Sequence, residues 1–128
     1  MKEIRIVGAG VPEAGWERAT VTLAGDRIAA CGPSREEPRR GDVDGRGGLL
    51  LPGLVDIHIH GAGGVDTAAP EELHRAAAAL ARHGVTSFLP TFPALPLEEL
   101  EDLLARTRRA AAALPPGAAR VAGFHLEG

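Results

Sequence analysis

The stretch that decides the fold is Leu51-Pro-Gly-Leu-Val-Asp-Ile-His-Ile-His-Gly61, in which an apolar run ends on two histidines one residue apart. The run from Leu49 to Ile59 is nearly continuous, which is typical of a strand buried on both faces of a parallel sheet. Side chains alternate between the two faces of a strand, so His58 and His60 point the same way. The stretch therefore predicts a buried strand that presents two imidazoles at its carboxyl end.

After this strand, helix and strand signals alternate. Glu71 to His83 and Leu97 to Leu114 have helix start and stop signals, while Val85 to Leu89 and Val121 to Leu126 are apolar strand segments. Strands that recur about every thirty residues with a helix between them define βα units on a parallel sheet. Residues 51–128 are therefore α/β, and three such steps fit either an open doubly wound sheet or a (β/α)₈ barrel.

Residues 1–50 have a different pattern, with frequent glycines, no helical periodicity, and a polar connection before the first long strand. The β-forming segments there are Glu3–Val7, Thr20–Leu23, Arg27–Cys31 and a short segment near Val43. Gly25-Asp26 supplies a hairpin turn between two of them. This pattern predicts part of a small β-sheet unit, and Cys31 is interpreted as a small core residue.

Composition excludes several classes of protein. The net charge is −3 and aromatic residues make up 3% of the chain, so neither a basic nucleic-acid surface nor base-stacking platforms are expected. No segment resembles a signal peptide or reaches membrane-spanning length, and a single cysteine fits a reducing compartment. We therefore expect a cytoplasmic protein that binds neither nucleic acid nor membranes. Because the chain stops at a strand exit, we also expect it to be the N-terminal portion of a longer protein.

The paired histidines predict a metal site. The carboxyl ends of strands are where α/β folds build active sites, and imidazole nitrogen suits zinc and similar ions. The third strand closes on Phe124-His-Leu-Glu-Gly128, which brings the Glu127 carboxylate to an equivalent strand exit. The alternatives are that His58 and His60 cap the strand or bond to backbone, and that Glu127 is a solvated loop carboxylate.

Other polar and glycine residues lie near these candidate ligands in the sequence. Asp56 shares a face with the histidines and would either orient one of them or accept a backbone hydrogen bond. His125 is interpreted as a supporting residue rather than a ligand. Gly63 and Gly64 match no nucleotide-binding fingerprint; they would let the backbone pass close to a metal or ligand, with phosphate binding as the alternative. Thr91 would line the pocket or form a turn.

Three motifs carry a family resemblance. Pro52-Gly-Leu-Val-Asp-Ile-His-Ile-His60 resembles the first-strand metal motif of the amidohydrolase superfamily, and Gly25–Gly32 and Asp42–Gly48 resemble the small β-sandwich that precedes its barrel. Within that superfamily, three segments are similar to N-acetylglucosamine-6-phosphate deacetylases. They are His60-Gly-Ala-Gly-Gly-Val-Asp66, Gly84-Val-Thr-Ser-Phe-Leu-Pro-Thr91 and Gly123-Phe-His-Leu-Glu-Gly128.

The resemblance implies the start of a (β/α)₈ metal-dependent hydrolase barrel, with its first three strands in residues 51–128 and part of a β-sandwich in residues 1–50. It implies hydrolysis of N-acetylglucosamine 6-phosphate, a small phosphorylated amino sugar, to glucosamine 6-phosphate and acetate. The implied metal ligands are Glu127, His58 and His60, holding one or two divalent ions (Zn, Fe, Mn or Co), of which two is the favoured hypothesis.

The same resemblance places two further histidine ligands and the aspartate that acts as general acid and base beyond Gly128. No catalytic residue is therefore expected within this chain, which should be inactive alone, and a homodimer of the complete protein is left open. The alternatives are a dihydroorotase, hydantoinase or deaminase relative, many of which use a carboxylated lysine on the fourth strand, and a non-catalytic remnant.

Overall fold

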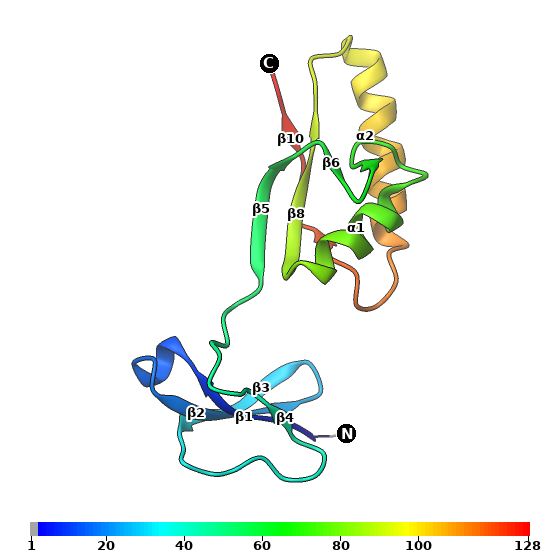
Figure 1. The fold of residues 1–128 in the computed structure, drawn as a ribbon. Coiled ribbons are helices and arrows are strands. Elements are labelled where there is room, and N and C mark those ends of the chain that lie inside the picture. Colours follow the sequence, from blue (N-terminus) through cyan, green and yellow to red (C-terminus); the bar gives the residue numbers. More distant parts are fainter. Residues whose placement is uncertain (1–2) are drawn as a thin grey trace. The chain divides into compact units, whose positions relative to one another are not determined.

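The structure is a computed structural model that describes residues 3–128, and the chain divides into two compact units (Figure 1). The first unit is Met1–Pro52 and the second is Gly53–Gly128. In the described residues, no helix combines the length and the apolar character that are needed to cross a membrane.

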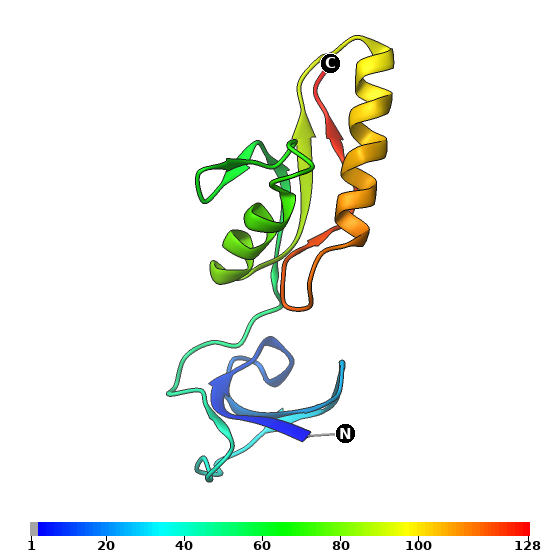
Figure 2. The same ribbon diagram turned by 90° about the vertical axis from the view of Figure 1, so that its right-hand side faces the viewer.

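The first unit is a four-stranded sheet in the order β3-β2-β1-β4. Its ribbon is the blue and cyan part of Figure 2. Its elements are β1 (Glu3–Gly10), the 3₁₀ helix η1 (Pro12–Ala14), β2 (Arg18–Ala24), β3 (Arg27–Pro33) and β4 (Val43–Asp44). Strands β1, β2 and β3 are antiparallel, and β4 joins β1 in parallel. The predicted short strands and the turn at Gly25-Asp26 are confirmed, because the chain reverses there with Gly25 at a φ of 65°.

The core of this unit is small. It is made by Val11, Ala19 and Val21, with Ile6 and Leu23 among the half-buried residues packed against them. The interpretation of Cys31 as a core residue is wrong, since the side chain is exposed on β3. Strand β3 lies at the end of the strand order, where only β2 is its neighbour, so an apolar residue there gains little burial.

The second unit is an α/β unit whose central strand is β8. Its elements are β5 (Leu54–Ile59), β6 (Gly61–Ala62), β7 (Val65–Asp66), α1 (Leu73–Arg82), β8 (Val85–Phe92), α2 (Leu97–Ala112), β9 (Arg120–Val121) and β10 (His125–Leu126). Strands β5 and β10 flank β8, β9 also pairs with β8, and all three pairings are parallel. The predicted alternation of strand and helix is confirmed, and the class is α/β.

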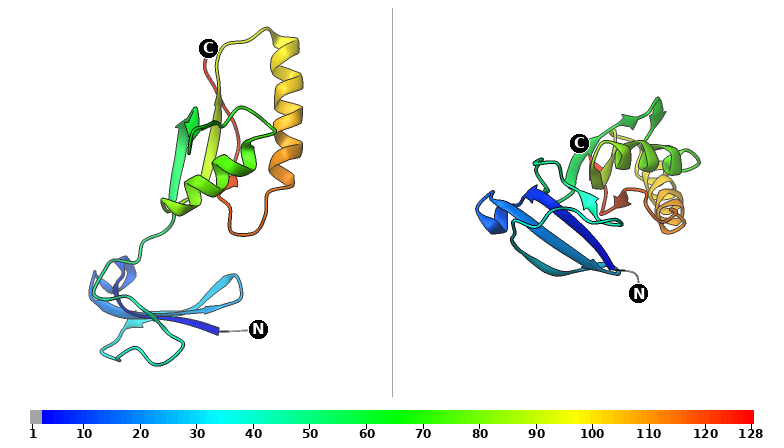
Figure 3. Two further views of the ribbon diagram at one scale, coloured as in Figure 1. Left: turned by 45° about the vertical axis from the view of Figure 1, so that its right-hand side comes forward. Right: turned by 60° about the horizontal axis from the view of Figure 1, so that its bottom comes forward.

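The two helices contact each other and share one core with β8 (Figure 3). Phe88 from β8 is fully buried among Leu73, Ala77 and Leu80 of α1 and Ala119. The packing fixes the direction of β8, whose carboxyl end leads toward the predicted metal ligands. Helix α2 has Glu98 and Glu99 in its first turn and Arg109 in its last turn, which suits the helix dipole.

Two predictions about strands need correction. The prediction that β5 is buried on both faces is wrong, because apolar side chains on each face are exposed. The exposed fractions are 56% for Leu54 on one face, and 61% and 65% for Val55 and Ile57 on the other. Strand β5 is the end strand of its sheet in the described residues, with β8 as its paired neighbour. The single strand predicted over Val121–Leu126 is two short strands, β9 and β10, which are separated by residues 122–124.

Candidate metal centre

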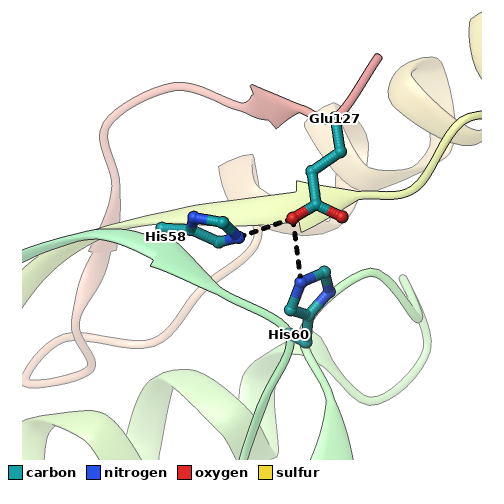
Figure 4. A group of neighbouring side chains, drawn as sticks. All are labelled: His58, His60 and Glu127. Atoms are coloured by element: carbon teal, nitrogen blue, oxygen red, sulfur yellow. Dashed lines mark hydrogen bonds and ion pairs between the residues drawn. The ribbon is translucent and has the colours of Figure 1, made fainter.

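The three predicted ligands lie together at the carboxyl ends of β5 and β10. His58 belongs to β5, His60 follows its last residue, and Glu127 follows β10 (Figure 4). Strand β8 lies between β5 and β10, so the three side chains converge from two strands that are not direct neighbours. One nitrogen from each histidine and one Glu127 oxygen all lie within 4.8 Å of one another.

The distances within this group suit a divalent ion. His60 Nε2 lies 3.4 Å from Glu127 Oε1, and His58 Nε2 lies 2.7 Å from the same oxygen. Two ligand atoms at ordinary zinc distances are about 3.3 Å apart in a tetrahedral site. The His60–Glu127 separation already matches that spacing, whereas the His58–Glu127 pair is a hydrogen bond that must lengthen by about 0.6 Å to admit an ion. The residues therefore fit a metal with a small side-chain movement.

The electrostatics favour a charged carboxylate in this group. Burial alone would raise the pKa of Glu127, but the hydrogen bond with His58 and the charges of His60 and His58 together outweigh it and lower the pKa. The side chain of Glu127 is therefore ionised at neutral pH, as a metal ligand must be. The side chains of His58, His60 and Glu127 are 47%, 57% and 39% exposed, so an ion can reach them from solvent.

Two buried threonines hold the backbone between the histidines. The Ile59 N–H donates to Thr91 Oγ1 at 2.9 Å, and Thr67 Oγ1 donates to the Ile59 carbonyl at 2.6 Å. Both threonines are 0% exposed. Ile59 is opposite Pro90 on β8, and proline has no N–H to offer to the ladder. We call Thr67 and Thr91 the threonine clamp, since together they bind both polar groups of Ile59.

The glycine-rich segment after the histidines forms a hairpin. Gly63 and Gly64 join β6 to β7 with φ values of 63° and 79°, which a two-residue turn of this kind requires. A Cβ on Gly63 would also lie 2.8 Å from the Ala79 Cβ. The hairpin returns the chain to the strand, where the Thr67 N–H donates to the His60 carbonyl at 2.8 Å. The turn and the packing thus account for both glycines without a ligand.

The remaining predicted residues lie beside the three ligands. Asp56 Oδ1 accepts a hydrogen bond from the His58 backbone N–H at 3.1 Å, which agrees with the backbone interpretation rather than with a carboxylate that orients a ring. His125 is half-buried and stacks on the His58 ring. Thr91 contacts strand backbone through its hydroxyl. The sequence interpretation missed Thr67, although Gly63-Gly64 between short β-forming segments is a hairpin signal that would have indicated it.

Replacing Thr91 with valine is expected to destabilise the protein by about 1–3 kcal/mol, because the buried Ile59 N–H loses its acceptor while the volume is kept. Thr91→Ser should lose less, since it keeps the hydroxyl. Urea denaturation of the full-length protein measures the free energy of unfolding of both Thr91 variants. Thr86→Val on the same strand is the control, because Thr86 is exposed and its hydroxyl bond is long at 3.4 Å. Equal stability of Thr91→Val and wild type would contradict a role for the clamp.

Comparisons with known proteins agree with the motifs. No family model matches the chain. An N-acetylgalactosamine-6-phosphate deacetylase from Escherichia coli O157:H7 is 36% identical over 91% of this chain and 30% of that protein. An N-acetylglucosamine-6-phosphate deacetylase from Bos taurus is 40% identical over 73% of this chain and 24% of that protein.

Solved structures give the same result over the whole chain. A mutant N-acetyl-D-glucosamine-6-phosphate deacetylase from Mycobacterium smegmatis, solved with N-acetyl-D-glucosamine-6-phosphate, superposes with a TM-score of 0.75 and 28% identity. The match covers 100% of this chain and 33% of that one. The chain thus spans a third or less of the length of these relatives, and over that span its resemblance to the N-acetylglucosamine-6-phosphate deacetylases is confirmed.

Proposed function

We propose that this chain is part of a metal-dependent hydrolase that removes the acetyl group from N-acetylglucosamine 6-phosphate, giving glucosamine 6-phosphate and acetate. The observation that carries the proposal is the convergence of His58, His60 and Glu127, whose ligand atoms lie within 4.8 Å of one another. The named activities of the relatives supply the substrate class. One of those relatives is named for the galactosamine epimer, which makes N-acetylgalactosamine 6-phosphate a second candidate substrate.

For the architecture, we propose that residues 1–50 are part of a β-sandwich and that residues 51–128 are the first βα units of a (β/α)₈ barrel. The parallel order β10-β8-β5, with α1 and α2 between successive strands, supports a barrel start. The exposed apolar side chains of β5 support it too, since in a closed barrel the packed interior would cover one face of this strand and the outer helices the other.

In the proposed site, His58, His60 and Glu127 hold one or two divalent ions of the zinc, iron, manganese or cobalt type, and two ions remain the favoured hypothesis. Two neutral imidazoles and one carboxylate make the mixed nitrogen and oxygen ligand set that such ions accept. When bound there, the metal supplies Lewis-acid chemistry, which activates water at neutral pH and polarises the acetamide carbonyl. The threonine clamp keeps the two histidines on the same face of β5 while Glu127 approaches from β10. The general acid and base is proposed to come from outside residues 1–128.

Metal removal tests the proposal. The full-length protein as purified is expected to contain divalent metal, and treatment with a chelator should reduce acetate release from N-acetylglucosamine 6-phosphate to background. Activity should return when zinc, manganese or cobalt is added back, because the apoprotein keeps its ligands. Elemental analysis and an acetate assay measure the two quantities, with N-acetylgalactosamine 6-phosphate run in parallel to decide between the epimers. Full activity in metal-free protein would overturn the proposal.

The competing function is that of a dihydroorotase, hydantoinase or deaminase relative. Many of those enzymes bridge two metals with a carboxylated lysine on the fourth strand. Here the carboxylate that meets the histidines is that of Glu127, which follows β10, the strand predicted as the third of the barrel. Hydrolysis of a cyclic amide or an aminopyrimidine, with none of either phosphosugar, would favour these relatives. A full-length protein that neither binds metal nor turns over any of these substrates would favour a non-catalytic remnant.

A further inference from the structure

His58 contacts two side chains from one short segment, His125 of β10 and Glu127 directly after it. His125 of β10 stacks on the His58 ring with 4.3 Å between ring centroids and 19° between ring planes. Glu127, two residues further along, meets the edge of the same ring at Nε2. The backbone of this segment is fixed against β8, because His125 pairs with Thr91 and the Glu127 N–H donates to the Phe92 carbonyl at 2.9 Å. Face and edge of the imidazole are thus both in contact with a segment whose backbone pairs with β8.

The face contact matters because the usual means of orienting a metal-binding histidine is not used here. Such a histidine generally donates its second ring N–H to a carboxylate, a carbonyl or water. Among the hydrogen bonds within residues 3–128 there is none to His58 Nδ1, and the Asp56 carboxylate, two residues earlier in the chain, accepts the His58 backbone N–H instead. The remaining ring neighbour, His60, meets His58 edge-on with centroids 5.4 Å apart, so His125 is the only one of the two that covers a ring face.

We infer that His125 is a positioning residue that sets the ring plane of His58 by stacking, and so aims His58 Nε2 at the ion that the proposed function requires. The inference rests on that proposed function. A flat ring in contact with one face restricts the rotation of His58 about its Cβ–Cγ bond, on which no hydrogen bond to Nδ1 acts. The role therefore depends on the shape of the His125 ring and not on its nitrogens.

Two substitutions of His125 distinguish a role of its ring shape from a role of its ring nitrogens. His125→Phe keeps a flat ring, whereas His125→Leu fills similar space without one. When the full-length protein is titrated with Co²⁺, His125→Leu is expected to weaken the binding of Co²⁺ about 3- to 10-fold. This is the range of affinity that the loss of an aromatic pair accounts for. His125→Phe should stay within about twofold of wild type. The visible absorption spectrum of bound Co²⁺ should change in His125→Leu and remain as in wild type in His125→Phe, since it reports the geometry of the ligands.

His74→Ala is the matched control, because His74 is an exposed histidine on α1 and should change neither the affinity nor the spectrum. Three outcomes would overturn the inference while leaving the metal centre standing. They are wild-type binding in His125→Leu, equal loss in the phenylalanine and leucine variants, and a loss above about 100-fold in both, which would make His125 a ligand. Wild-type protein that binds no Co²⁺ would overturn the proposed function and this inference with it.

Discussion

Glu127→Gln is expected to weaken metal binding by more than about 100-fold and to reduce acetate release to background, while the fold is retained. Loss of a group that merely supports a ligand costs about 10- to 100-fold in metal affinity, so loss of a ligand itself should cost more. Glutamine has nearly the shape of glutamate but lacks the negative charge, and both histidines converge on the same Glu127 oxygen. Isothermal titration with Zn²⁺ and an acetate assay on the full-length protein measure the effect.

The matched control for this variant is Glu71→Gln. Glu71 also forms an ion pair, with Arg106 at 3.4 Å, but its side chain is 69% exposed and belongs to the surface of the second unit. Its substitution should leave both metal affinity and acetate release unchanged. Circular dichroism of both variants checks that the fold is intact. Near-normal turnover in Glu127→Gln would remove this residue from the proposed ligand set.

Phe88→Ala is expected to destabilise the protein by about 3–5 kcal/mol, because it removes a large side chain from a packed core and leaves a cavity. Phe88 is 0% exposed on the central strand and contacts residues from α1 together with Ala119. Loss of this contact should loosen α1 from β8 at the same time. Urea denaturation followed by circular dichroism gives the free energy of unfolding, provided that the transition is two-state.

Leu97→Ala provides the comparison for the core variant. Leu97 begins α2 and is 69% exposed, so its truncation removes apolar atoms that are mostly in water already. Its effect should stay within about 0.5 kcal/mol, the usual range for surface substitutions. Similar losses in Phe88→Ala and Leu97→Ala would show that the core around Phe88 does not stabilise the fold.

The alternation of strands and helices could be predicted because long elements repeat their pattern over many residues. The ends of helices α1 and α2 all lie within two residues of the predicted ends. The short hairpin of β6 and β7 was missed because two-residue strands leave no periodicity to detect. The burial of β5 and Cys31 was predicted incorrectly. The local sequence shows that a residue is apolar, but it does not show which other element, if any, packs against that residue.

The proximity of the three candidate ligands could also be predicted. His58 and His60 share a face by strand alternation, and Glu127 follows an equivalent strand, so the topology of a parallel sheet brings them to one edge. The threonine clamp could not be predicted in the same way. Thr67 reaches the Ile59 carbonyl only because the hairpin turns the chain back, and Thr91 accepts from the Ile59 N–H where the register between β5 and β8 shifts.

The threonine clamp also has a consequence for how preparations of the protein should be judged. If β5 slid by one residue against β8, every side chain on it would change faces, and both imidazoles would turn away from Glu127. Such a molecule would keep its helices and its circular dichroism spectrum, but it would have lost the hydrogen bonds of Thr67 and Thr91 to Ile59. If purified Thr67 or Thr91 variants contain less than the full amount of metal, the shortfall would therefore equal the fraction of molecules in which β5 is shifted. Adding more metal to the growth medium would not restore the missing metal.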